Sequence, residues 1–216
     1  KRQSGIISLK DSGITSPKGM EGHSYATWDM PIEQAIIKKV VTDDGGDYSK
    51  INLISTSVED IKAALSSNID SVWIYYAWDG IACELQGLDT NFFYFKDYSP
   101  ELDDYSPVII ANNDFLKNNS EVAKKFMAAL SKGYDYAIEN PDDAAQILVD
   151  ANEGLDIELC KKSQNWLASQ YKADADKWGV IDQKRWDAFY GWVYDNGLCE
   201  IDIPDGFGFS NDYLPE

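Results

Sequence analysis

Three strand–helix pairs followed by a further strand, between residues 24 and 95, constrain the fold more than any other feature of the sequence. Each strand candidate is a short run rich in β-branched and aromatic residues, and apolar residues at helical spacing follow it. The four strands are expected at residues 24–28, 52–55, 72–75 and 91–95. This order predicts an α/β fold with a parallel or mostly parallel sheet and right-handed crossovers.

The stretch 69–87, with the sequence IDSVWIYYAWDGIACELQG, points most directly to a binding site. After the expected strand come two aromatic residues, Tyr76 and Trp78, and a turn at Asp79 that leads into a short helix. Such a strand ends at the carboxyl edge of the sheet, where open α/β folds bind ligands. Aromatic rings and a carboxylate at this edge predict a site for a flat, polar small molecule.

The first strand of the series ends in a similar group of residues. Trp28 and Asp29 follow that strand, and Glu33 lies one turn into the next helix. Rings at strand ends can sandwich a planar ligand, and nearby carboxylates can accept its hydrogen bonds. The structural alternatives stay open, because an indole can fill the core and an aspartate before a helix can be its N-cap. Both interpretations also apply to Trp78 and Asp79.

The pattern changes after residue 96. A polar connector precedes a strand candidate at 107–111 (PVIIA), and helices are expected from residue 120, at 141–151, from 156 and from 182. Val122 and Phe126 share one face of the first of these helices. Aromatic residues at helical spacing in the later helices predict core packing: Trp166, Trp186, Phe189 and Tyr190. These regions predict one contiguous lobe and a second lobe formed by the flanking segments.

The charge balance excludes one class of partner. The chain has 19 basic and 37 acidic residues among 216, which gives a formal net charge of −18. A nucleic-acid surface needs clustered Lys and Arg, so we expect no nucleic-acid partner. An acidic surface that aids solubility is the simplest interpretation, and a cationic ligand is the alternative that composition leaves open.

The sequence contains no motif for catalysis, metal binding or cofactor binding. His23 is the only histidine and lies in a polar turn, so a histidine-based metal cluster or a Ser-His-Asp triad is not expected. Glycine-rich phosphate loops are absent as well. Cys83, Cys160 and Cys199 are far apart, so at most one pair could form a disulfide. We therefore expect no metal, no cofactor and no enzymatic activity.

Four segments, in order along the chain, resemble one family of transport proteins. They are SGITSPKGMEGHSYATWDMPIEQAIIKKVV, IDSVWIYYAWDGIACELQGLD, SPVIIANNDFLKNNSEVAKKFMAALSKGYDYAIENPDDAA and SQNWLASQY…WGVIDQKRWDAFYGWVYDNGL. Together they resemble the aminopyrimidine (thiamine-precursor) solute-binding proteins of ABC importers, which are related to nitrate, sulfonate and taurine binders. The resemblance implies a type II periplasmic-binding-protein-like fold, with two lobes joined by two crossover segments and the ligand enclosed between them.

The resemblance extends only to the carboxyl-terminal two-thirds of the family. It implies that residues 14–104 form lobe two, and that residues 1–13 and 105–216 form a lobe one that is incomplete at its N-terminus. Ser4 and Tyr105 would lie at the two crossovers and contact ligand. The chain opens on KRQSGIISL, which we interpret as the start of a processed or truncated product. Either a partner chain supplies the missing strands or the chain is a fragment, because an exposed sheet edge invites pairing.

The function implied by the resemblance is extracytoplasmic. The chain would be a periplasmic or membrane-anchored lipoprotein that binds an aminopyrimidine and delivers it to an ABC permease. One alternative keeps this role for riboflavin, an alkylsulfonate, taurine or another nutrient. Another is a pyrimidine-synthesis enzyme of the same fold, but such enzymes use a cysteine-rich motif and an active-site histidine. Here the cysteines are dispersed and His23 lies in a loop.

Overall fold

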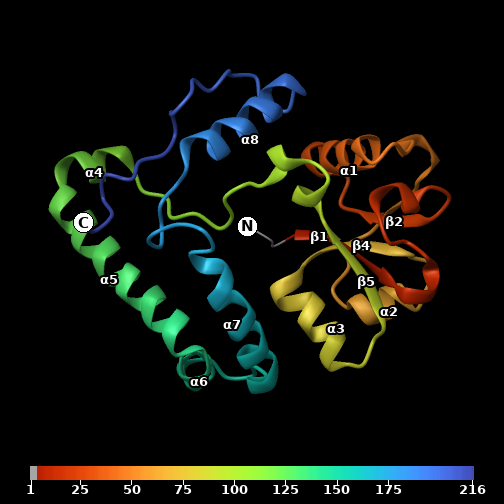
Figure 1. The fold of residues 1–216 in the computed structure, drawn as a ribbon, viewed down its shortest axis with the longest axis horizontal. Coiled ribbons are helices and arrows are strands. Elements are labelled where there is room, and N and C mark those ends of the chain that lie inside the picture. The colour runs from red at the N-terminus through yellow and green to blue at the C-terminus, as the bar shows by residue number, and fades with distance from the viewer. Residues whose placement is uncertain (1–3) are drawn as a thin grey trace. The chain divides into compact units, whose positions relative to one another are not determined.

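The computed structural model describes residues 4–216, which divide into two compact units (Figure 1). Residues 4–103 and 189–202 form one of them, here called the sheet unit. Residues 104–188 and 203–216 form the other, here called the helical unit. The last helix, α8 (Gln183–Asp195), runs from the helical unit into the sheet unit.

The sheet unit contains a five-stranded sheet in the order β3-β2-β4-β1-β5. The strands are β1 (Ser4–Leu9), β2 (Ser24–Thr27), β3 (Asn52–Ser55), β4 (Ser71–Tyr75) and β5 (Thr90–Tyr94). β2 pairs in parallel with β3 and β4, whereas β1 pairs antiparallel with β4 and β5. The four strands expected from the sequence therefore share one direction, and the prediction of a mostly parallel α/β sheet is confirmed.

β1 lies near the middle of this sheet, and this differs from the expected grouping of residues 1–13 with the other lobe. Ile6 and Ile7 are both fully buried, on opposite faces of the strand. A strand that is apolar on both faces needs cover on both, which only an inner position supplies. Residues 4–13 consequently belong to the sheet unit, and residues 1–3 lie outside the described part of the chain.

Helices cover both faces of the sheet. α1 (Pro31–Asp43) packs on one face, where its Ile37, Val40 and Val41 are fully buried against Tyr25. α2 (Ile61–Leu65) and α3 (Ile81–Leu85) pack on the other face around Ile7, Val72 and Ile74. A π-helical turn, η4 (Tyr76–Gly80), joins β4 to α3. Short 3-10 turns occupy Lys10–Ser12, Pro17–Met20, Tyr48–Lys50, Phe95–Asp97 and Pro100–Leu102.

The helical unit consists of α4 (Asn113–Asn118), α5 (Ser120–Glu139), α6 (Pro141–Ala151), α7 (Ile157–Tyr171) and the start of α8. The helices expected from residues 120, 141, 156 and 182 are confirmed. Asp156 is the N-cap of α7 and accepts a hydrogen bond from the Leu159 amide at 2.9 Å. No helix within residues 4–216 combines the length and the apolar character needed to cross a bilayer.

The strand predicted at 107–111 is wrong. The segment has no regular structure, and Ile109 and Ile110 are 53% and 87% exposed. Its β-branched residues favour a strand, but the described part of the helical unit contains no strand with which it can pair. Val122 and Phe126 on α5 are exposed too, at 55% and 57%. The helical unit thus has an uncovered apolar surface.

Candidate functional site

The carboxyl edge of the sheet brings together most of the residues expected to bind ligand. β2 and β4 are neighbours and run in parallel, so the residues that follow them leave the sheet side by side. β1 runs the opposite way, and its first residue, Ser4, pairs with Tyr75 at the end of β4. Trp28, Asp29, Tyr76, Trp78, Asp79 and Ser4 therefore share one edge of the sheet unit.

The buried side chain of Glu33 stabilises the connection between β2 and α1 through hydrogen bonds. Its carboxylate is 1% exposed and accepts hydrogen bonds from the Tyr25 hydroxyl at 2.5 Å, the Thr27 hydroxyl at 2.9 Å and the Trp28 amide at 3.1 Å. Burial, reinforced by the bond to Glu33, raises the pKa of Tyr25 far above its ordinary value, so the phenol remains a proton donor. Glu33, which was expected to contact ligand, is buried here and fixes the backbone and side chains of this corner.

Trp28 and Asp29 project from this corner. Asp29 has a left-handed backbone, with φ of 59°, and its amide donates to the Thr27 hydroxyl at 3.0 Å. The indole of Trp28 is 43% exposed and packs on Trp73, with 5.2 Å between ring centroids. Trp73 was not singled out from the sequence, because its position inside a strand gave no sign that it supports a surface ring. Trp28 therefore has one ring face fixed by the protein and part of its surface open to solvent.

The N-cap alternative for the two aspartates is wrong. The N-cap of α1 is Met30, and that of α3 is Gly80; neither helix end has a side-chain capping bond. Asp29 instead accepts a hydrogen bond from the Ser55 hydroxyl at the end of β3. Asp79 lies within η4 and is half-buried. Burial raises the pKa of Asp79, and a hydrogen bond with the Tyr75 backbone opposes that rise.

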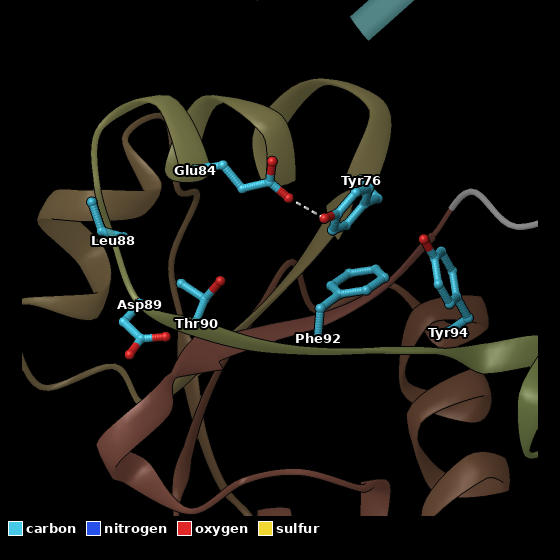
Figure 2. A pocket seen from close by; sticks show the side chains of 7 residues that line it. All are labelled: Tyr76, Glu84, Leu88, Asp89, Thr90, Phe92 and Tyr94. Carbon is cyan, nitrogen blue, oxygen red and sulfur yellow. Dashed lines mark hydrogen bonds between the residues drawn. The ribbon is translucent and has the colours of Figure 1, made fainter. Parts of the chain in front are cut away.

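A pocket of about 420 Å³ lies beside this edge, between α3 and the outer strand β5 (Figure 2). Tyr76 and Glu84 form one side, and the Tyr76 hydroxyl donates to the Glu84 carboxylate. Thr90, Phe92 and Tyr94 rise from β5 on the other side, with Leu88 and Asp89 at one end. Of these residues the sequence pointed only to Tyr76. The alternation of Thr90, Phe92 and Tyr94 along β5 is the signal that could have revealed the rest.

Tyr105 belongs to the helical unit and is held there by its own neighbours. Its hydroxyl accepts a hydrogen bond from the Asp182 amide at 2.8 Å, and the Arg185 guanidinium lies over its ring at 3.9 Å from the centroid. Arg185 also donates to the Asp104 carbonyl at 2.6 Å. These contacts fix the start of the helical unit, and they give Tyr105 a structural role whether or not it contacts ligand.

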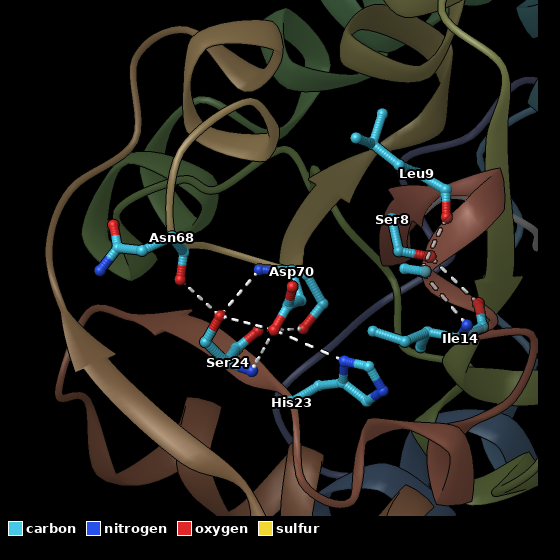
Figure 3. A network of polar contacts seen from close by, with 9 residues as sticks. Ser8, Leu9, Ile14, His23, Ser24, Asn68 and Asp70 are labelled. Carbon is cyan, nitrogen blue, oxygen red and sulfur yellow. Dashed lines mark hydrogen bonds and ion pairs between the residues drawn. The ribbon is translucent and has the colours of Figure 1, made fainter.

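His23, Ser24 and Asp70 form a polar network at the opposite end of the sheet, where β2 and β4 begin (Figure 3). The Ser24 hydroxyl oxygen lies 2.6 Å from the Asn68 carbonyl oxygen and 2.9 Å from the Asp70 carboxylate, either of which can accept its proton, while His23 Nδ1 lies 3.5 Å from Asp70. Burial alone would raise the pKa of Asp70, but hydrogen bonds from the Ser24 backbone and side chain and the nearby His23 lower it. The network joins two strand starts and lacks the serine-to-histidine order of a triad.

Among residues 4–216, no group of three or more His, Cys, Asp or Glu side chains is arranged to hold a metal ion. Cys83 and Cys160 are buried thiols and Cys199 is partly exposed, and all three are free in the structure. The carboxyl edge of the sheet and the adjoining pocket therefore hold the candidate binding groups of the sheet unit. They offer aromatic rings and carboxylates, which suit noncovalent recognition.

Comparisons with known proteins agree with this architecture. A family model described as NMT1/THI5 like matches residues 1–144. Over 194 residues the chain is 27% identical to the formylaminopyrimidine-binding protein of Halalkalibacterium halodurans, covering 87% of this chain. The match spans 58% of that relative, so the chain corresponds to little more than half of its length.

Solved structures of the same fold include binding proteins and an enzyme. The periplasmic aliphatic sulphonate binding protein SsuA from Escherichia coli superimposes with a TM-score of 0.66 at 14% identity, covering 99% of this chain and 72% of that one. The alkanesulfonate-binding protein SsuA from Xanthomonas axonopodis pv. citri gives 0.58 at 14%, covering 90% and 65%. The desulfurization enzyme DSZB gives 0.57 at 10%, covering 99% and 73%. The chain thus has the expected α/β fold of periplasmic binding proteins.

Proposed function

The chain belongs to the NMT1/THI5-like family, and from that premise we propose that it is the substrate-binding component of an ABC importer whose cargo is an aminopyrimidine. The observation that carries this proposal is the corner where buried Glu33 presents the Trp28 indole beside the Asp29 carboxylate. The Trp28 ring, which contacts Trp73 at an interplanar angle of 39°, offers its exposed surface to a flat heterocycle. The identity to a formylaminopyrimidine-binding protein agrees with this cargo.

The carboxylates at the edge favour a ligand that carries an amino group. An aminopyrimidine pairs an exocyclic amine, which donates hydrogen bonds, with ring nitrogens, which accept them. The Asp29 and Asp79 carboxylates at this edge can accept hydrogen bonds from the amine. A sulfonate would meet the uncapped start of α1, which favours an anion, but it would also meet the Asp29 and Asp79 carboxylates, which repel one. We therefore propose an aminopyrimidine as the cargo in preference to taurine, an alkylsulfonate or riboflavin.

An enzyme of this fold is the second class of function, and DSZB shows that the fold can carry one. We do not favour this class, because an enzyme needs a catalytic base near its site. The single histidine, His23, pairs with Asp70 at the end of the sheet opposite the carboxyl edge. Nucleophilic catalysis needs a base beside the nucleophile. We accordingly propose noncovalent binding with no chemical conversion and no cofactor.

The two units can be assigned to the two lobes of a binding protein. We assign the sheet unit to lobe two and the helical unit to a lobe one that needs further strands, supplied by chain outside residues 1–216 or by a partner chain. The exposed apolar residues of the helical unit support this assignment: Ile109, Ile110, Val122, Phe126, Ile147 and Leu148. Delivery to an ABC permease, and a periplasmic or lipid-anchored location outside the cytoplasm, follow from the importer role.

Isothermal titration of the chain with formylaminopyrimidine, hydroxymethylpyrimidine, thiamine, riboflavin and taurine tests the cargo. We expect heat from the pyrimidines, and we expect Trp28→Ala to weaken their binding by about tenfold or more, since stacking of one base contributes about 1–3 kcal/mol. Asp29→Asn should weaken the amine-bearing ligands only. Leu53→Ala, which removes an exposed side chain on β3, is the matched control.

Two results would overturn the proposal in different ways. Binding of taurine with silence toward every pyrimidine would refute the cargo while leaving the importer role in place. Unchanged pyrimidine affinity in Trp28→Ala would show that the site lies elsewhere. Thermal melting of each variant separates loss of binding from loss of the fold.

A further inference from the structure

We propose that the pocket between α3 and β5 is a second binding site, for an alkylated ammonium ion of the size of choline. The pocket has a volume of about 420 Å³ and opens widely to solvent, and its lining combines three aromatic rings with two carboxylates. The site is separate from the Trp28 corner, because β5 is the outermost strand beyond β1 whereas Trp28 follows β2 on the other side of β4. The proposal does not depend on the cargo assigned above.

The three rings meet inside the pocket, with Tyr76 on the α3 side and Phe92 and Tyr94 on the β5 side. The ring centroids of Tyr76 and Phe92 are 4.9 Å apart, and those of Phe92 and Tyr94 are 4.7 Å apart with the rings nearly perpendicular. Rings this close leave no room for a ligand between them, so a ligand lies over them. The face of an aromatic ring carries negative potential, and a cation within about 6 Å of the centroid is attracted to it.

The positions of two of these rings leave no room for a side chain at Gly80 or Gly5. A side chain at Gly80 would lie 2.6 Å from the Tyr76 ring, and one at Gly5 would lie 2.8 Å from the Phe92 ring and would collide with the Phe93 carbonyl. Gly5 lies in β1, opposite Tyr94 in β5, and Gly80 closes the turn η4. Separate glycines, from distant parts of the sequence, therefore hold two of the three rings against the backbone.

The carboxylates around the pocket favour a cation, and the aromatic rings favour an alkylated one. Glu84 accepts the hydrogen bond of the Tyr76 hydroxyl, and Asp89 forms an exposed ion pair with Lys10 at 3.4 Å. Both carboxylates supply negative potential, which Lys10 partly offsets, and three aromatic rings make up most of the remaining lining. A primary ammonium would need acceptors for its N–H groups, whereas an alkylated ammonium needs only ring faces and nearby negative charge. The pocket therefore suits a trimethylammonium group better than a primary amine.

Titration calorimetry of the chain with choline and tetramethylammonium chloride, at constant ionic strength, tests the site. We expect saturable binding of both ions and weaker binding of ethylammonium. Phe92→Leu keeps an apolar side chain but removes the ring, and should weaken choline binding by about tenfold. Tyr94→Leu should give the same result and replaces Phe92→Leu if that variant melts early. Leu85→Ala, on exposed α3 surface outside the lining, is the control and should bind normally.

Three outcomes would overturn the assignment. Choline that gives no saturable heat at millimolar concentration would exclude the site, and ethylammonium that binds as well as choline would exclude an alkylated cation as its ligand. Trp28→Ala should leave choline binding unchanged, so a loss in that variant would show that the pocket is not a separate site. Choline binding that persists while all pyrimidines fail would refute the cargo and leave this site intact.

Discussion

Replacement of Glu33 by alanine is the most direct test of how the β2–α1 corner is held. The side chain is 1% exposed, and its carboxylate accepts from the Tyr25 hydroxyl, the Thr27 hydroxyl and the Trp28 amide. Hydrogen bonds to a charged group contribute about 1.5–3 kcal/mol each, and a buried group left without its partner costs about 1–3 kcal/mol. In Glu33→Ala three neutral donors lose their acceptor, so we expect the free energy of unfolding to fall by about 3–5 kcal/mol.

Glu33→Gln separates the charge of the side chain from its shape. The amide oxygen can take the place that accepts from Thr27 and Trp28, and the amide nitrogen can donate to the Tyr25 oxygen. The hydrogen bonds then survive without a charged acceptor, at an expected cost of about 1–2 kcal/mol. Because the Trp28 amide keeps its partner, Glu33→Gln should retain pyrimidine binding better than Glu33→Ala does.

Urea denaturation followed by tryptophan fluorescence measures both variants. Glu59→Ala, at an exposed position of the same unit, is the matched control and should change the midpoint little. A double-mutant cycle with Tyr25→Phe should give a coupling energy, since the two side chains share a hydrogen bond. Equal midpoints for Glu33→Ala and Glu59→Ala would refute the account of the corner, and additivity with Tyr25→Phe would refute the pairing.

Three further predictions concern other parts of the chain. The pKa of Asp70 is lowered in the folded state, so the stabilisation by its carboxylate is present above the unfolded-state pKa of about 3.9 and is lost as pH falls through the folded-state pKa. The Tm of the wild type should therefore exceed that of Asp70→Asn by less as the solution is acidified. A Tm difference that stays constant from pH 7 to pH 3 would contradict this. Gly80→Ala should destabilise by about 1–3 kcal/mol and disturb the Tyr76 ring, as measured by denaturation and tyrosine NMR signals, and an unchanged midpoint would contradict the steric account. Phe126→Asp should reduce binding of a hydrophobic dye and self-association in light scattering without lowering the Tm, whereas a large drop in Tm would show that Phe126 is core.

The architecture of the sheet unit could be predicted from the sequence because its signals are local. Strands β2, β3, β4 and β5 lie within one or two residues of their expected bounds, and the helices between them follow as expected. The place of β1 could not be predicted this way. Its pairing with β4 and β5 joins residues about sixty to ninety positions apart. A short apolar run reports burial, but it does not report which neighbours bury it.

The sequence indicated which residues gather at the carboxyl edge of the sheet, but it did not indicate which of them are buried or how they pair. The rule that ligands bind at the carboxyl edge brought Trp28, Asp29, Tyr76 and Asp79 to the same end of the sheet. It could not show that Glu33 points inward, since a carboxylate one turn into a helix looks the same in sequence whether it meets solvent or three buried donors. Nor could it show that the Tyr76 ring joins Phe92 on β5, a contact set by the fold.

The segment 107–111 shows most clearly where sequence preference stops deciding structure. Val108, Ile109 and Ile110 have the strongest β preference, yet a strand forms only where a neighbour accepts and donates its backbone hydrogen bonds. The additional strands proposed above for lobe one would also cover Val122 and Phe126, since an amphipathic helix needs a layer against which to bury its apolar face. One added sheet would satisfy both requirements, which is why we treat the unpaired segment and the uncovered helix face as a single feature of the helical unit.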